Sequence, residues 1–166
     1  MGLARDHAAD YRWPVSPHRG SVRQFSRQGV IRAQPHQVFD FVTDQSKLPL
    51  WSPEVVSSEV KGGGPVQEGS RLVQRRKQGG RTRTNAVEVV THDRPRKHAV
   101  RTRIMGVEMN FAFSFWPEGS GTKVTFDCTC EGKGLGRLME GMMAKAVETA
   151  DDQRIERLKT VIETRR

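Results

Sequence analysis

The stretch that decides the fold is VEMNFAFSFWPEGSGTKVTFDCTCEG, residues 107–132. Every second side chain is apolar in both halves, at Met109, Phe111, Phe113 and Phe115 and then at Val124, Phe126, Cys128 and Cys130. A period of two is typical of strands that turn one face to the core and the other to water. The residues EGSG at 118–121 separate the two runs and indicate a turn. The stretch therefore predicts an antiparallel pair in a half-buried sheet.

The segment after this pair has the periodicity of a helix. Apolar residues recur mostly at steps of three and four, at Leu135, Leu138, Met139, Met142, Ala146, Ala150, Ile155, Leu158 and Ile162. Charged residues fill many of the other positions, so we expect one long amphipathic helix from about 135 to 164. A sheet with one apolar face and a helix with one apolar stripe bury these surfaces against each other.

Upstream of residue 107 the chain reads mainly as strands. Alternating segments lie at 21–33, 54–62, 69–78, 81–93 and 98–106, and Gly79-Gly80 is typical of a hairpin turn. Pro35 suits the start of a short helix, and Ser46 can cap a second helical turn whose length Pro49 limits. The predicted order is strand, two short helices, six strands and a long helix, which is an α+β fold with about seven antiparallel strands.

Length and composition set the broad class. The 166 residues suffice for one domain with a real core, which we expect at 21–166, after an N-terminal arm of about 20 residues (1–20) that we expect to be disordered. No apolar run approaches the roughly 20 residues that span a bilayer, and the start lacks the apolar centre of a secretory signal, so we expect a cytoplasmic protein. Cys128 and Cys130 read as buried free thiols, and we expect neither a metal nor a cofactor.

The net charge of +9 is concentrated in one part of the chain. Residues 71–103 hold eleven basic and two acidic residues and therefore carry the whole excess. Such a field favours an acidic partner, for example an acidic carrier protein, although it can equally be a solvated face of strands. Nucleic acid is a poor candidate, because this segment has no Phe, Tyr or Trp on which bases could stack.

Several phrases of the sequence point to a known family. They are IRAQPHQVFDFVTDQSKLPLWSPEV, EGSRLVQRRKQGGR, EVVTHDRPRK, GSGTKVTF and RIERLKTVIE, within residues 22–164. In phrase and order the chain resembles the polyketide cyclase/dehydrase branch of the START-like (SRPBCC) superfamily. The resemblance implies a helix-grip fold, in which a curved antiparallel sheet wraps around the C-terminal helix, and a cavity for an apolar small molecule between them.

Candidate ligand contacts follow from the apolar faces and from the break after the first helix. We expect the cavity to be lined by Leu48, Trp51, Met109, Phe111, Phe113, Phe115, Met139, Met142 and Met143. Methionine adapts to ligands of varied shape. Two alternatives stay open, a methionine-filled core without a useful cavity, and a Trp51 that only anchors the linker.

Catalysis would require polar groups inside the apolar cavity. The candidates on strands are Asn85, His92, Arg101, Arg103 and Glu108. Arg101 and Arg103 share a strand face that could point inward, to hold an enolate or carboxylate, or outward into water. The sequence leaves two functions in competition, binding of an apolar molecule and catalysis as a polyketide cyclase or dehydratase, and the discriminating observation is whether ionisable side chains converge in the cavity. The oligomeric state cannot be read from the sequence.

Overall fold

The computed structural model describes residues 22–165, and the order of its elements is the predicted one. The strands are β1 (Arg23–Ile31), β2 (Val55–Val60), β3 (Arg71–Gln78), β4 (Arg81–Asp93), β5 (Lys97–Ile104), β6 (Val107–Glu118) and β7 (Gly121–Gly132). The helices are α1 (Pro35–Thr43), the 3-10 turn η2 (Gln45–Lys47), α2 (Leu48–Trp51), α3 (Gly136–Asp151) and α4 (Arg154–Thr164). The arm predicted at 1–20 lies outside the described residues.

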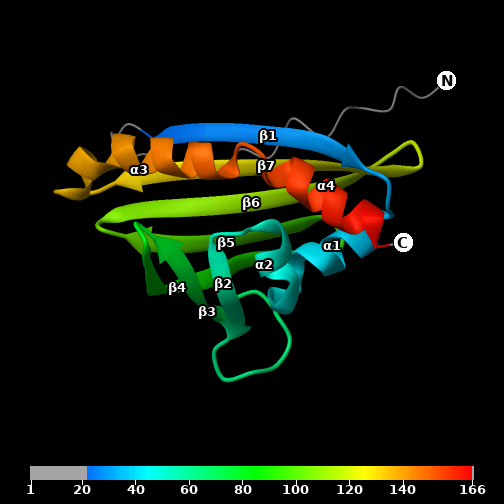
Figure 1. Ribbon diagram of the computed structural model, residues 1–166, viewed down its shortest axis with the longest axis horizontal. Helices are drawn as coiled ribbons and strands as arrows, with labels where there is room; N and C mark the ends of the chain where they lie inside the picture. The colour runs from blue at the N-terminus through cyan, green and yellow to red at the C-terminus, as the bar shows by residue number, and fades with distance from the viewer. Residues whose placement is uncertain (1–21, 166) are drawn as a thin grey trace.

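The seven strands form one antiparallel sheet in the order β1-β7-β6-β5-β4-β3-β2. Figure 1 shows the sheet wrapping from β1 round to β2 and β3, with α3 and α4 against its β1–β7 side, α1 against β5–β7 and α2 beside β2. This arrangement confirms the predicted helix-grip fold.

The alternation in residues 107–132 determines which sheet face is buried. Met109, Phe113 and Phe115 are at most 6% exposed, and Val124, Phe126, Cys128 and Cys130 are at most 1% exposed. The ring centroids of Phe113 and Phe126 lie 4.8 Å apart on neighbouring strands. Both predicted apolar faces therefore belong to the main core, and both cysteines are free and buried.

The two short helices turn the chain from β1 to β2. Pro35 begins α1, and the backbone N–H of Gln34 donates to the Gln37 side chain 3.0 Å away. Asp44, rather than Ser46, caps the next turn, since its carboxylate accepts from the backbone N–H of Ser46 at 3.0 Å and from the Ser46 hydroxyl at 2.6 Å. These local bonds fix the change of direction that carries Leu48 and Trp51 into the core.

The C-terminal segment is helical as predicted, but it is divided into α3 and α4 rather than continuous. Gln153 has φ −105° and ψ 13°, outside helical values, and separates the two helices. The break brings two buried charged residues, Asp151 and Arg154, into contact with each other. Ile155, Leu158 and Ile162 of α4 are buried as their spacing predicts.

The apolar stripe predicted for α3 is wrong by about one residue. Leu135, Leu138 and Met142 are 86%, 83% and 61% exposed, and Ala146 and Ala150 are exposed as well. The helix instead buries Gly136, Glu140 and Ala144, with Met139 and Met143 half-buried beside them. Two close contacts set this rotation: Gly136 packs on the backbone of Gly106, and the Glu140 carboxylate accepts from the backbone N–H of Gly132 at 3.0 Å.

Candidate functional site

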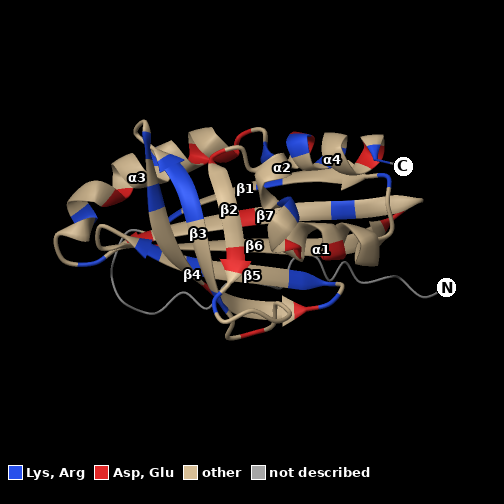
Figure 2. Ribbon diagram, turned by 60° about the horizontal axis from the view of Figure 1, so that its bottom comes forward, with Lys and Arg blue, Asp and Glu red and all other residues tan. Residues whose placement is uncertain are grey.

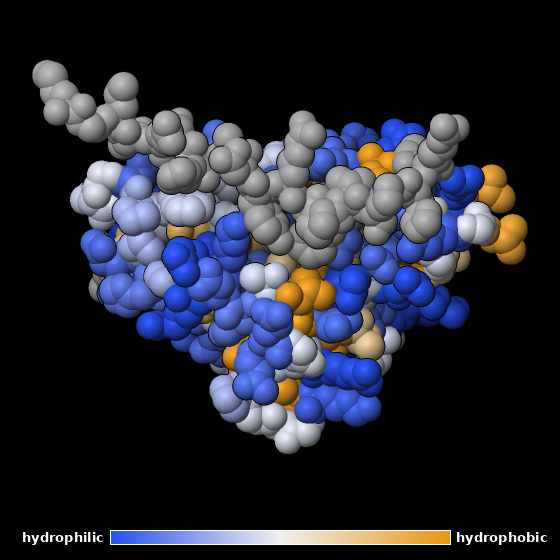
Figure 3. Space-filling model, turned by 180° about the vertical axis from the view of Figure 1, so that it is seen from behind, coloured by the Kyte–Doolittle hydropathy of each residue, from blue (hydrophilic) through white to orange (hydrophobic). Residues whose placement is uncertain are grey.

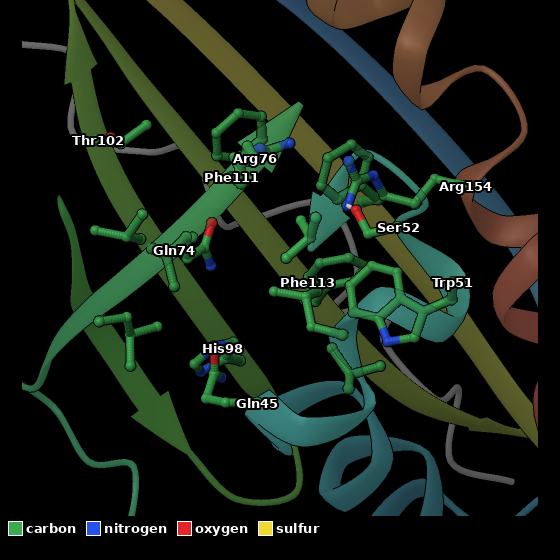
Figure 4. A pocket seen from close by; sticks show the side chains of 17 residues that line it. Gln45, Trp51, Ser52, Gln74, Arg76, His98, Thr102, Phe111, Phe113 and Arg154 are labelled. Atoms are coloured by element: carbon green, nitrogen blue, oxygen red, sulfur yellow. Dashed lines mark hydrogen bonds between the residues drawn. The ribbon is translucent and has the colours of Figure 1, made fainter. Parts of the chain in front are cut away.

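A pocket opens between the concave face of β2–β7 and the helical residues opposite it (Figure 4). Its empty volume is about 620 Å³, including solvent at its mouth, of which about 60 Å³ is open to the centres of water molecules. It is lined by Val42, Gln45, Leu48, Trp51, Ser52, Val55, Leu72, Gln74, Arg76, Val87, His98, Val100, Thr102, Phe111, Phe113, Phe126 and Arg154. We call this space the cavity. Mostly apolar walls with a few polar groups are typical of small-molecule sites.

One end of the cavity carries two guanidinium groups. Arg154, only 7% exposed, donates to the Ser52 hydroxyl at 3.0 Å and to Glu54 Oε1 at 3.1 Å, and it pairs with Asp151. Arg76 donates to the same Glu54 oxygen at 2.7 Å. Glu54 is the only partner of Arg76 among residues 22–165, so Arg76 keeps N–H donors for another acceptor.

The charges at this end are coupled. Burial acts to raise the pKa of Glu54, but Arg154 and the Ser52 hydrogen bond outweigh it and hold the pKa below its usual value. For Asp151, burial outweighs Arg154 and raises the pKa. Burial also lowers the pKa of Arg76, which nevertheless remains a cation because an arginine titrates far above neutral pH. The two guanidinium groups are thus held charged in a largely buried place, where their hydrogen bonds are strong.

The opposite end of the cavity presents an imidazole. His98 is 5% exposed, and its Nδ1 lies 3.2 Å from Nδ1 of His92 on the neighbouring strand. Burial, reinforced by His92, lowers the pKa of His98 to about 4, so the ring is neutral near pH 7. Gln45 lies beside His98 and accepts from the Ser58 hydroxyl at 2.6 Å. Figure 4 shows Arg76, Arg154 and Ser52 on one side of the cavity and His98 with Gln45 on the other.

Aromatic and aliphatic side chains form the walls between these ends. The indole of Trp51 meets the ring of Phe113 edge-on at a centroid distance of 5.8 Å, and the guanidinium of Arg154 lies 5.4 Å from the indole centroid. Trp51 is 2% exposed, and its Nε1–H has no partner within residues 22–165. Trp51 therefore anchors the linker and also forms part of the cavity wall.

The predicted ligand contacts divide into three groups. Leu48, Trp51, Phe111 and Phe113 line the cavity. Met109 and Phe115 are buried in the core and do not reach the cavity surface, and Met139 and Met143 pack half-buried against the same core. Met142 is 61% exposed on the outer side of α3, because the helix is rotated as described above, so its placement at the cavity is wrong.

None of the five catalytic candidates lines the cavity. Arg101 pairs with Glu88 at 2.9 Å and Arg103 with Glu108 at 2.8 Å, all on the outer face of the sheet, because the inward positions of β5 are His98, Val100 and Thr102. Asn85 lies opposite Gln74 on the concave face but does not line the cavity.

His92, the fifth catalytic candidate, is half-buried rather than on the surface as its place near a strand end suggests. It lies against Phe39 at a centroid distance of 5.1 Å and reaches the cavity only through His98.

Three ionisable residues that line the cavity were not among the sequence-based candidates, namely Arg76, His98 and Arg154. Arg76 had a signal, since Leu72, Gln74 and Arg76 occupy alternate positions of β3 and share its inward face. His98 falls at the start of a strand whose register sets it opposite Phe113. Arg154 had no signal, because it faces inward only where the helix breaks.

Two further findings bound the chemistry. Within residues 22–165, no group of three or more His, Cys, Asp or Glu side chains is arranged to hold a metal ion. Over the same range, no helix is both long enough and apolar enough to cross a bilayer.

Three solved structures illustrate the likeness of fold. The chain is 15% identical to Ara h 8.0201, with a TM-score of 0.70 over 87% of this chain and 99% of that one. For the Zhui aromatase/cyclase from Streptomyces sp. R1128 the identity is 14% and the TM-score 0.70, over 87% of this chain and 96% of that one. For the di-domain ARO/CYC StfQ from the steffimycin biosynthetic pathway, the identity is 14% and the TM-score 0.69, over 87% of this chain and 52% of that one.

Sequence comparison gives the family directly. No curated protein sequence matches the chain. The family model described as "Polyketide cyclase / dehydrase and lipid transport" matches residues 23–163, nearly all of the described chain, and confirms the START-like resemblance. The chain therefore belongs to the polyketide cyclase/dehydrase and lipid transport family.

Proposed function

We propose that the protein binds an apolar small molecule of polyketide, lipid or aromatic type in the cavity. The observation that carries this proposal is the pairing of aromatic and aliphatic walls with polar groups at two opposite ends. A planar or extended molecule with oxygen atoms at its ends would gain apolar contact along the walls. Its oxygens would accept from Arg76 and, after a small shift of the indole, from the Trp51 N–H, which has no partner among residues 22–165.

A thermal-shift series and native mass spectrometry test this proposal. The panel contains multi-ring phenols and ketones, a long-chain fatty acid and a plain polycyclic hydrocarbon. At about one hundred times the dissociation constant, a ligand that binds only the native state adds roughly 2.7 kcal/mol, which is several degrees in melting temperature for a domain of this size. We expect the ring compounds with oxygen atoms to give the largest shift.

A matched pair of variants locates the binding. Val100→Phe adds bulk at a lining position, whereas Thr84→Phe adds the same bulk at an exposed position of β4 that does not line the cavity. The first variant should lose the shift and the second should keep it. No shift with any compound for the unaltered protein, or an undiminished shift in Val100→Phe, would reject binding in the cavity.

Catalysis as a cyclase or dehydratase is the second candidate function, and one observation favours it. Ionisable side chains do line the cavity, with Arg76 and Arg154 at one end and neutral His98 at the other. A guanidinium can stabilise the enolate of a carbonyl substrate, and a neutral imidazole can accept a proton. The basic strands β3 to β5, prominent in blue in Figure 2, would then suit an acidic carrier that delivers the substrate.

Neighbouring arginines provide the test of catalysis. Arg76→Met removes the guanidinium that faces the cavity, and Arg75→Met removes its exposed neighbour on the outer face of β3. With a polyketide chain as substrate, Arg76→Met should lower turnover by about 10²- to 10³-fold, which is more than it weakens ligand binding. Arg75→Met and Arg101→Ala should leave the product profile unaltered. Ligand binding without any turnover by the unaltered protein would leave binding as the function.

A further inference from the structure

We propose that the end of the molecule where β7 leads into α3 docks on an anionic lipid surface. Four apolar side chains form this end, Met105, Leu135, Leu138 and Met142, and we call them the apolar tip. The proposal concerns a surface rather than the cavity, so it does not depend on which ligand the cavity takes.

The side chains of the apolar tip are mostly exposed. Leu135 is 86% exposed, Leu138 83%, Met105 66% and Met142 61%, whereas the remaining exposed large apolar residues of the described chain reach only 40–42%. Figure 3 shows apolar side chains projecting at this end of the molecule. Single exposed apolar residues are ordinary, but four that gather at one end of a monomer mark an interaction site.

The fold holds these side chains outward. Gly106 packs on Gly136, with a Cβ built on Gly106 only 3.2 Å from the Gly136 Cα, so the β5–β6 turn and the start of α3 are locked together. This contact joins the residue after Met105 to the residue after Leu135, and Leu138 and Met142 follow Leu135 on the same side of the helix. Met105 itself has φ 52°, a left-handed conformation that costs energy in a residue with a side chain. The surrounding contacts therefore maintain a strained turn that presents an apolar side chain to water.

The charges around the apolar tip favour an anionic partner. Exposed Lys133 and Arg137 flank Leu135 in the sequence, and Figure 2 shows basic residues at this end of α3. Among residues 22–165, the acids near the apolar tip are engaged or face elsewhere. Glu140 is buried and bonds to the Gly132 N–H, Glu108 pairs with Arg103, and Glu131 lies across from Glu108 on the outer face of the sheet.

The shape of the apolar tip selects a lipid surface over a folded protein. Its side chains project from the end of the molecule (Figure 3), and two leucines and two methionines are flexible enough to enter a soft layer without complementary pockets. Apolar side chains flanked by lysine and arginine match the interfacial region of an anionic membrane. There the apolar side chains leave water while the cations contact anionic headgroups. The chain as a whole carries a net charge of +9, which adds long-range attraction.

Vesicle flotation with the full chain tests the docking. The probes are vesicles of pure phosphatidylcholine and vesicles with phosphatidylcholine and phosphatidylglycerol at three to one. We expect binding to the anionic vesicles, at least tenfold weaker binding to the neutral ones, and weakening with added salt. The double variant Leu135→Ser/Leu138→Ser should bind the anionic vesicles at least tenfold more weakly, because its apolar contribution is lost.

The control alters exposed apolar residues elsewhere. Val30→Thr/Val56→Thr removes two that lie on β1 and β2, and this variant should bind the anionic vesicles like the unaltered protein. Melting temperature and far-UV circular dichroism establish that both variants fold. Three outcomes would overturn the proposal: no binding to anionic vesicles, equal binding by the Leu135→Ser/Leu138→Ser variant, or self-association through the apolar tip in place of vesicle binding.

Discussion

His98 illustrates how the neighbours of one residue decide its charge. It occupies an inward position of β5, with Phe113 opposite on β6 and His92 opposite on β4. Burial, helped by His92, lowers its pKa from 6.5 to about 4. The same ring on the other face of the strand, where Arg101 lies, would meet water and Glu88 instead.

This lowered pKa makes stability depend on pH. Above pH 6.5 His98 is neutral in both the native and the unfolded chain, so its contribution is fully present. Between pH 6.5 and about 4 only the unfolded chain takes up the proton, so stability falls as the pH falls, by roughly 3 kcal/mol over the whole window. His92, whose pKa is also lowered by burial, acts in the same direction.

Urea unfolding at pH 7 and pH 5 measures the effect. His98→Gln should be less stable at pH 7 but lose less stability on acidification, whereas His36→Gln, at an exposed histidine, should behave like the unaltered protein. Asp151, whose raised pKa acts in the opposite direction, is present in all three proteins and cancels in the comparison. The idea fails if the slope between pH 7 and pH 5 is the same with and without His98.

The element that the sequence describes least well is α3, and glycines explain why. A hydropathy stripe places Leu135, Leu138 and Met142 toward the core, yet backbone packing of Gly136 against Gly106 and Gly132 rotates the helix so that they face water. Contacts between backbones have no hydropathy signal. The strands were predictable because alternation alone fixes their faces, as in residues 107–132.

Two glycines of α3 should respond oppositely to alanine. A Cβ on Gly136 would overlap the backbone oxygen of Gly106, so Gly136→Ala must displace the start of the helix and should cost about 1–3 kcal/mol. A Cβ on Gly141 would lie 3.8 Å from the Arg23 side chain, which is ordinary contact. Gly141→Ala should therefore raise the free energy of unfolding by up to about 1 kcal/mol through helix propensity. Chemical denaturation measures both, and a stabilising Gly136→Ala would contradict the packing described.

At the scale of the whole molecule, the sequence predicts the order of helices and strands but not the polar residues that form the site. The cavity gathers side chains from α1, η2, α2, six strands and the start of α4, so no local pattern contains it. Strand β3 carries cations on both faces, with Arg71, Arg75 and Lys77 outward and Arg76 inward. The distribution of charge in the sequence therefore could not show which arginine lines the cavity. The sequence predicted the apolar walls better because phenylalanine and tryptophan are buried wherever a core forms.

The size of the cavity predicts how a ligand enters. Only about 60 Å³ is open to the centres of water molecules, so a molecule of three rings does not fit until the lining residues move. If the protein binds such a ligand, the observed rate should level off at high ligand concentration, because opening then limits it. Stopped-flow fluorescence of the tryptophans, including Trp51 in the wall, measures this rate. A rate that stays linear in concentration up to the solubility limit would argue for an already open site.

The two buried thiols have a practical consequence. Cys128 and Cys130 lie on the covered face of β7, and their mutual hydrogen bond together with burial raises the pKa of the Cys128 thiol. A thiolate reacts with alkylating reagents and a buried thiol does not. Labelling therefore proceeds only when β7 is transiently uncovered. The rate at which the native protein is alkylated thus measures how often this part of the sheet opens.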